Sequence, residues 1–363
     1  MFSTAFFSVL ATSIASVFAA VALAGTPKPE ALRIAPGYAI STFQKDVDGA
    51  RSLAYAPGGT LFVGTRGKKV YAIKNGKLEV LAKDLDTPNG IAFKDGDLYV
   101  GEPKRILRYE KIEAALAKNP KEMPKPTVVF SGLPEDGGHD WRYMRFGPDG
   151  ALYVGIGAPC NICNREKDEP RFSTILRFAK LDGSAPEIYA RGIRNTVGFD
   201  WQPKTGLLFF TDNGRDWLGD DSPDDELNVA TKAGEHFGYP YCHAGDVPDP
   251  KLTGNRACGE FVPPKAKLGA HVAALGMRFL DASTALIAEH GSWNRSAPSG
   301  YRVVKVTLGS GKPVVEPFIE NFRTPDGKVL GRPVDLEVLP DGSILLSDDQ
   351  ADAIYRIARM GKK

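Results

Sequence analysis

The chain repeats one hydrophobic pattern along most of its length: an apolar strand, a short turn that usually contains glycine, and a second apolar strand. Copies of this pattern are found at 54–64, 91–101, 144–155, 198–211, 275–289 and 336–348. An Asp-Gly turn between two alternating apolar runs is a strong signal for a β-hairpin. The pattern therefore predicts a chain built mainly of antiparallel hairpins.

Further apolar runs extend these hairpins. They supply a third strand at 69–73, 174–178, 300–306 and 353–357, and a fourth strand at 78–81, 127–130 and 187–189. Six copies of such a unit predict an all-β fold, a six-bladed β-propeller of four-stranded antiparallel blades. The last unit lacks an outer strand, so we expect the N-terminal strand at 37–43 to close the ring. A sandwich or a double barrel is the competing architecture, and a helix at 112–118 is expected as a surface insertion.

The length of 363 residues permits one large domain or two modest ones. Because repeats depend on their neighbours, we predict one propeller domain over 25–363. Residues 1–24 form an uncharged apolar run that ends in Ala-Leu-Ala, as a secretory signal peptide does before its cleavage site. A membrane anchor is the alternative, since the run is nearly long enough to span a bilayer. Either interpretation places the folded part outside the cytosol, periplasmic or secreted, and cleavage would leave no stable membrane insertion.

Charge and cysteine usage reduce the number of possible partners and cellular compartments. A net charge of +2, without a basic stripe, predicts no nucleic-acid partner. Four cysteines agree with export, and we expect two local disulfides, Cys160–Cys163 and Cys242–Cys258. A zinc site is the alternative. A second alternative is that Cys160 and Cys163 form a redox-active pair, although their Cys-x-x-Cys motif follows a strand and does not open a helix.

The segment 212–228 is unusually rich in carboxylates. Six of them, Asp216, Asp220, Asp221, Asp224, Asp225 and Glu226, follow the strand at 207–211. Such a group repels itself unless it is well solvated or shares a cation. The segment therefore predicts a site for a hard cation at the end of a strand.

Other chemistry-bearing residues lie in the loops that lead into the innermost strands. His139 lies among glycines and charged residues, a setting that suits a general base; a loop-bracing histidine is the alternative. Arg51, Arg194 and Arg332 would suit a ligand with several carboxylates, unless each pairs with a neighbouring acid. Trp293, in the loop at 289–295, suits stacking on a planar ring or plain packing.

With these residues in view, the chain resembles the soluble pyrroloquinoline-quinone (PQQ)-dependent sugar dehydrogenases, the glucose/sorbosone dehydrogenase family of six-bladed propellers. It is most similar to the sorbosone-dehydrogenase-like branch. The resemblance covers about 50–357 and rests on four motifs. These are His139 eight residues before Gly147-Pro148-Asp149-Gly150, the pair Arg194-Asn195, the run 212–215 followed by 224–228, and Arg332 before Pro340-Asp341-Gly342.

The resemblance implies an activity and two cofactors. His139 would accept the proton of a substrate hydroxyl while a hydride passes to PQQ, and Arg194 would stabilise the developing charge. It implies Ca²⁺ held partly by the carbonyls of Gly214 and Arg215, with Asp225 in the same loop and Glu226 matching a ligand of a further calcium site. The residues expected to contact PQQ are Arg51, Arg194, Asn195, Trp293, Arg295 and Arg332.

Two departures from the family pattern concern the candidate site. Val334 stands where the soluble glucose enzyme has a second arginine. Ala158 stands where that enzyme has a carboxylate that orients the histidine, so that His139 here depends on Asp140, Asp136 or another group.

Three functions are compatible with the sequence. The first is an exported PQQ- and calcium-dependent dehydrogenase that oxidises a sugar, aldose or related alcohol and passes electrons to an acceptor such as a small redox protein. The second is a calcium-dependent propeller lactonase, and the third is a non-catalytic binding module. The arginines and histidine at the channel entrance favour an anionic cofactor, and hence the first.

Overall fold

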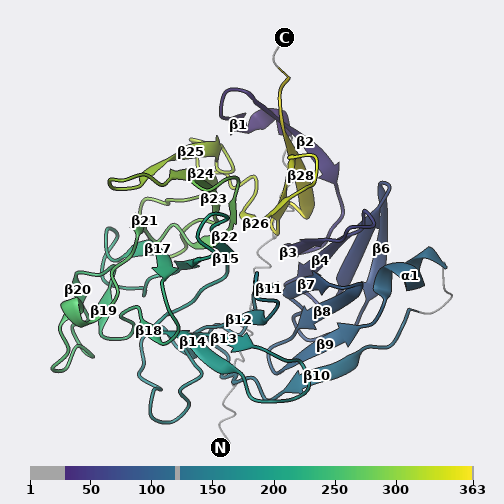
Figure 1. Ribbon diagram of the computed structural model, residues 1–363. Coiled ribbons are helices and arrows are strands. Elements are labelled where there is room, and N and C mark those ends of the chain that lie inside the picture. Colours follow the sequence, from purple (N-terminus) through teal and green to yellow (C-terminus); the bar gives the residue numbers. More distant parts are fainter. Residues whose placement is uncertain (1–28, 119–122, 362–363) are drawn as a thin grey trace, which may run out of the picture.

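The computed structural model describes residues 29–118 and 123–361, so the predicted signal peptide lies outside the described residues. Strands form six antiparallel sheets around a common centre, and α1 (Ile112–Ala117) lies on the outer side (Figure 1). The predicted six-bladed propeller is confirmed, and the sandwich and the double barrel are excluded. Two short 3-10 helices, Pro29–Ala31 and Cys258–Glu260, complete the helical part.

The first three blades are built from consecutive strands, ordered from the centre outward. The first contains β3 (Ala50–Tyr55), β4 (Leu61–Thr65), β5 (Val70–Lys74) and β6 (Lys77–Ala82). The second contains β7 (Gly90–Lys94), β8 (Asp97–Gly101), β9 (Arg105–Tyr109) and β10 (Thr127–Ser131). The third contains β11 (Met144–Phe146), β12 (Leu152–Ile156), β13 (Thr174–Phe178) and β14 (Glu187–Arg191), with β18 (Glu235–His236) added in parallel at its edge.

The next two blades carry additions to this plan. The fourth contains β15 (Phe199–Trp201), β16 (Leu208–Asp212), β17 (Asp224–Ala230) and β21 (Ala266–Ala270). Between β17 and β21 the chain makes an excursion that includes the small hairpin of β19 (Cys242–His243) and β20 (Val247–Pro248). The fifth contains β22 (Ala274–Phe279), β23 (Thr284–Glu289), β24 (Arg302–Thr307) and β25 (Val314–Glu320), with β1 (Arg33–Ile34) at its edge.

The sixth blade joins the two ends of the described chain. It contains β26 (Pro333–Val338), β27 (Ile344–Asp348), β28 (Ala353–Arg359) and, as its outer strand, β2 (Tyr38–Gln44). The pairing of β2 with β28 runs from Tyr38 opposite Arg359 to Gln44 opposite Ile354. The predicted closure of the ring by an N-terminal strand is therefore confirmed.

The repeated turn and the repeated apolar strands explain this architecture. Gly59, Gly96, Gly150 and Gly342 have φ between 78° and 91°, a region that glycine enters without steric cost, so a tight turn that contains glycine joins the first two strands in four of the blades. The apolar faces then meet between blades. Phe62 of the first blade packs with Leu98 of the second, and a buried cluster of this kind fills each of the six junctions. Each blade therefore depends on its neighbours to bury its apolar faces.

Ion pairs cross the central channel between the inner strands. The guanidinium groups of Arg145 on β11 and Arg278 on β22 lie 3.0 and 3.1 Å from the carboxylate of Glu337 on β26. Asp200 on β15 lies 3.6 Å from Arg145. Charges at this depth are stable only when they are paired, so the network ties four inner strands together within the channel.

Candidate functional site

The predicted site residues converge because of where they stand relative to the strands. In an antiparallel blade, the start of the inner strand and the end of the second strand lie at the same end of the channel. His139, Arg194 and Arg332 precede β11, β15 and β26, and Arg51 is the second residue of β3. Gly214 and Trp293 follow the second strands β16 and β23. All six line one pocket of about 380 Å³, together with Asn195 and Asp225.

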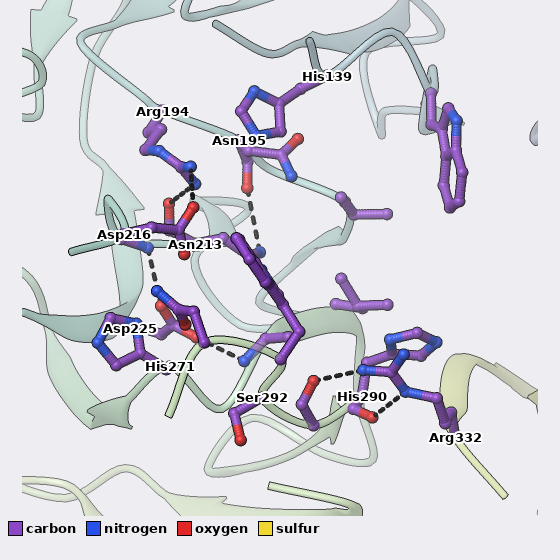
Figure 2. A pocket seen from close by; sticks show the side chains of 18 of the residues that line it. His139, Arg194, Asn195, Asn213, Asp216, Asp225, His271, His290, Ser292 and Arg332 are labelled. Carbon is purple, nitrogen blue, oxygen red and sulfur yellow. Dashed lines mark hydrogen bonds and ion pairs between the residues drawn. The ribbon is translucent and has the colours of Figure 1, made fainter. Parts of the chain in front are cut away.

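The pocket has two charged sides. Figure 2 shows His139, Arg194 and Asn195 on one side, and His290 and Arg332 on the other. Asp216 lies beside Arg194, and Asp225 lies near His271 on the adjoining part of the wall. The arrangement brings together residues from all blades except the second, as the sequence predicted for a channel mouth.

The ring of His139 is oriented by the backbone. Its Nδ1 lies 2.6 Å from the carbonyl oxygen of Ala158. Asp140 instead accepts a hydrogen bond from the backbone N–H of Gly137, and Asp136 pairs with Arg165. Neither of the two suggested aspartates therefore holds the ring. Because a carbonyl only accepts, Nδ1 carries the proton and Nε2 keeps a free lone pair.

Burial makes His139 a neutral base. Desolvation, with a contribution from the positive charge of Arg194, lowers the pKa of His139 to about 4. A protonated imidazole would have to lose its hydration inside the pocket, which explains the direction of the shift. At neutral pH the side chain is therefore unprotonated and can accept a proton at Nε2.

Arg194 is fixed from several directions. Its Nη2 lies 3.0 Å from the carboxylate of Asp216, and its Nη1 lies 3.2 Å from the carbonyl oxygen of Asn213. The backbone N–H groups of Arg194 and Asn195 both donate to the buried carboxylate of Asp212, at 3.0 and 2.7 Å. Asp212 thus sets the position of the Arg194-Asn195 backbone, and the loop after β16 binds the guanidinium of Arg194.

Arg51 also pairs with an acid, in a buried network. Its Nη1 lies 2.8 Å from Asp349, whose other oxygen lies 2.8 Å from Nε2 of His290. Burial lowers the pKa of His290 to about 4, so at neutral pH it donates as a neutral imidazole. The indole ring of Trp141 covers the guanidinium of Arg51, with the ring centroid 4.2 Å from Cζ.

Arg332 differs from the other two arginines. Its Nε and Nη2 donate to the carbonyl oxygens of His290 and Gly291, at 3.1 and 2.5 Å. Among the described residues it forms no ion pair with a carboxylate. Of the three pocket arginines, Arg332 is therefore the one that has no carboxylate partner among the described residues, so its charge is the least neutralised toward an anionic ligand.

The carboxylates of the predicted metal loop are used by the protein itself. Asp225 accepts from the backbone N–H groups of Gly214 and Ala273. Glu226 accepts from the N–H of Ala244 and the amide of Asn228. The carbonyl oxygens of Gly214 and Arg215 accept no hydrogen bond from the described residues, so these oxygens are the ones free to bind a hard cation. No cluster of three or more His, Cys, Asp or Glu suited to a metal ion occurs in 29–118 or 123–361.

Three predicted residues do not line the pocket. The guanidinium of Arg215 pairs with Asp249, and Glu226 is buried behind the loop. Arg295 donates to the backbone oxygen of Asp220 and to the carboxylate of Asp221. Arg295 thus links the loop after β23 to the acidic loop after β16.

Several pocket residues were missed in the sequence. His271, His290 and Asn213 line the pocket, as do the apolar residues Val197 and Leu275. Val334 packs with these two apolar residues, so an apolar patch occupies the place of the second arginine of the glucose enzyme. The position of each missed residue at a strand end is the one signal that could have pointed to it.

The disulfides agree with the prediction. Cys160 bonds to Cys163, and Cys242 bonds to Cys258, so the zinc alternative for these cysteines is excluded. Two exposed tryptophans, Trp141 and Trp293, line the pocket, and Trp217 is also exposed. The rings of Trp217 and Trp293 contact edge to face, with centroids 6.4 Å apart.

Comparison with known proteins gives consistent matches. A family model described as TrAA12-like matches residues 32–360. A curated protein of Borreliella burgdorferi, described as uncharacterized, is 31% identical over 98% of this chain and 98% of its own length.

Solved structures share the fold. The calcium structure of a Trichoderma reesei Carbohydrate-Active Enzymes Family AA12 protein is 22% identical and has a TM-score of 0.79, over 94% of this chain and 100% of its own. The holo form of the PQQ domain of a Coprinopsis cinerea pyranose dehydrogenase is 19% identical, with a TM-score of 0.79 over 92% and 98%. The PQQ-bound aldose sugar dehydrogenase of Streptomyces coelicolor is 20% identical, with a TM-score of 0.62 over 90% and 99%.

Proposed function

The chain belongs to the TrAA12-like family, and from this premise we propose that it is an exported dehydrogenase that uses PQQ and Ca²⁺ to oxidise an alcohol group of a sugar or aldose. One observation carries the proposal. A neutral histidine with a free Nε2 and three arginines, contributed by four different blades, line a single pocket. The names of the similar structures, which include a pyranose dehydrogenase and an aldose sugar dehydrogenase, support the substrate class.

The residues of the pocket fit a planar, multiply anionic cofactor. Arg332 offers a guanidinium that no carboxylate neutralises in the described chain, while Arg51 and Arg194 already hold Asp349 and Asp216. We assign Arg332 and Arg194 to the carboxylates of PQQ, and the exposed face of Trp293 to its ring. The carbonyl oxygens of Gly214 and Arg215 would hold the calcium ion.

The chemistry divides between the cofactor and the chain. PQQ, when bound, would supply the acceptor for one hydride, which carries both electrons of the oxidation. His139 accepts the hydroxyl proton of the substrate at Nε2, and the hydrogen bond from Nδ1 to Ala158 keeps that nitrogen aimed at the pocket. Arg194 provides positive charge on the same side, where negative charge develops as the proton leaves.

Export agrees with the two disulfides. Two disulfides persist in an oxidising compartment. The described part of the chain contains no helix long and apolar enough to cross a membrane.

Calorimetric titration of the protein without cofactor tests the proposal. We expect PQQ to bind tightly only when Ca²⁺ is present, and Arg332→Ala and Arg194→Ala each to weaken binding by tenfold or more. Arg356→Ala is the matched control, because the half-buried Arg356 pairs with Asp341 on the sixth blade and does not line this pocket. Failure of the wild-type protein to bind PQQ with or without Ca²⁺ would overturn the dehydrogenase assignment.

A further inference from the structure

The turn closed by Cys160 and Cys163 lies beside the pocket, and it contacts both groups assigned to the chemistry. At its start, the carbonyl of Ala158 accepts the proton of His139 Nδ1, and the N–H of Ala158 donates to the carbonyl of Arg194, at 2.7 Å. The turn therefore joins the histidine loop to the arginine loop.

Asn161, inside the turn, holds the guanidinium of Arg194 at two points. Its backbone oxygen lies 3.0 Å from Nε, and its side-chain Oδ1 lies 3.0 Å from Nη2. Two N–H groups of one guanidinium that donate to such a pair of oxygens leave it little freedom to rotate. Asn161 thus fixes the direction of the guanidinium, while Asp216 supplies the opposite charge.

Asn161 also holds the loop that carries Asp216. Its Oδ1 accepts from the N–H of Asp216 at 2.8 Å, and its Nδ2 donates to the oxygen of Asp216 at 3.2 Å. The amide thus satisfies both backbone groups of the residue that pairs with Arg194. One side chain sets the position of both members of the ion pair.

The turn is held closed from two sides. The disulfide joins the residues that flank Asn161-Ile162. The hydroxyl of the buried Tyr239 accepts from the N–H of Cys163 at 3.0 Å. Because the disulfide spans two residues only, Asn161 has little backbone freedom, and the entropy lost when it binds Arg194 is correspondingly small.

We propose that Asn161 is a positioning residue for Arg194, and that the Cys160–Cys163 disulfide keeps Asn161 in place. The proposal rests on the proposed function for what Arg194 does, but the contacts themselves can be tested in the protein without PQQ. Asn164 is the matched control. It lies in the same segment, and its amide contacts Tyr241 and Glu166 instead of Arg194.

The first test is an NMR titration of His139 in the cofactor-free protein. Freeing Arg194 takes its charge away from the imidazole, so Asn161→Ala should raise the pKa of His139 by on the order of one unit, and Asn164→Ala should not. In an Arg194→Ala background, Asn161→Ala should add no shift. An unchanged pKa in Asn161→Ala, or the same shift with and without Arg194, would overturn the proposal.

The second test uses Cys160→Ser/Cys163→Ser, and it remains available if Asn161→Ala does not fold. This variant should shift the pKa of His139 in the same direction as Asn161→Ala, and a pKa equal to that of the wild type would overturn the role given to the disulfide. In titrations with PQQ and Ca²⁺, Asn161→Ala should weaken binding by about tenfold, since an unfixed arginine must be ordered by the ligand. If the wild type does not bind PQQ, the proposed function fails, while the NMR result still decides the role of Asn161.

Discussion

The Nδ1 atom of His139 lies 2.6 Å from the carbonyl oxygen of Ala158, so the candidate base is oriented by a backbone group. A carboxylate partner would stabilise the protonated ring and raise its pKa. A carbonyl partner leaves burial to dominate, and the pKa falls to about 4. The side chain is therefore ready to accept a proton over the whole range from pH 5 upward.

Replacing His139 should separate chemistry from cofactor binding. We expect His139→Gln to lower kcat by about 10²- to 10⁴-fold, the usual contribution of a general base, and to leave the Kd for PQQ nearly unchanged. Steady-state kinetics with a sugar and a dye acceptor, together with calorimetry, measure the two effects. His236→Gln is the control, because His236 pairs with Glu166 outside this pocket. A kcat equal to that of the wild type would show that another group takes the proton.

Adding one methyl group at Gly157 should displace the histidine. A Cβ at this position would lie 2.4 Å from Cβ of His139 and 3.0 Å from Oδ1 of Asn195. We expect Gly157→Ala to reduce kcat at least tenfold, because a small misplacement of a catalytic group is costly. In Gly309→Ala the new methyl group meets nothing within 4 Å, so its kcat should match that of the wild type. Equal rates for the two variants would contradict the close contact.

The buried network around Asp349 should contribute strongly to stability. Against the effect of burial, the interaction with His290 and the positive charge of Arg51 hold the pKa of Asp349 below its ordinary value. Asp349→Ala leaves the guanidinium of Arg51 buried without its partner and should cost about 3–5 kcal/mol of unfolding free energy. Glu316→Ala, which removes an exposed pair with Lys305, should cost less than about 1 kcal/mol. Urea unfolding compares them, and similar losses would mean that the buried pair has no special weight.

Asp348 should make stability depend on pH. Its Oδ1 accepts three backbone N–H groups, those of Arg332, Gln350 and Ala351, while its buried Oδ2 has no partner among the described residues. Burial raises the pKa of Asp348 to about 7. The folded state therefore holds a proton that the unfolded state releases above its ordinary pKa, and stability is lost as the pH rises from about 4 through 7.

Asp348→Asn removes that titration and keeps an oxygen for the three N–H groups. The melting temperature of the variant, relative to the wild type, should increase as the pH is raised from 5 to 8. Thermal unfolding monitored by circular dichroism at several pH values measures this trend. A difference that stays constant with pH would show that Asp348 keeps its charge in the folded protein.

The sequence predicted the parts of the structure that repeat. Turn residues and apolar runs can be recognised locally in the sequence. The six blades and the closing strand therefore followed from the repeated pattern alone. The positions of His139, Arg51, Arg194 and Arg332 followed from the same pattern, because each stands at the start of an inner strand.

The supporting contacts could not be predicted in this way. The carbonyl of Ala158 has no residue signature, since every residue carries one. Asp349 lies 298 positions from Arg51 in the chain, and only the closed ring brings them together. Asn161 was hidden between two cysteines whose spacing indicated a staple and gave no direction for the side chain between them.

The closure of the sixth blade has a consequence for the order of folding. Since β2 pairs with β28, the ring cannot be completed until nearly the whole chain is available. Contacts this far apart in sequence form slowly, and until they form the edges of β2 and β28 remain open to other strands. In a protein that crosses a membrane as an unfolded chain, both ends are on the same side only after translocation is complete. Such a protein would tolerate a late closure of the ring well.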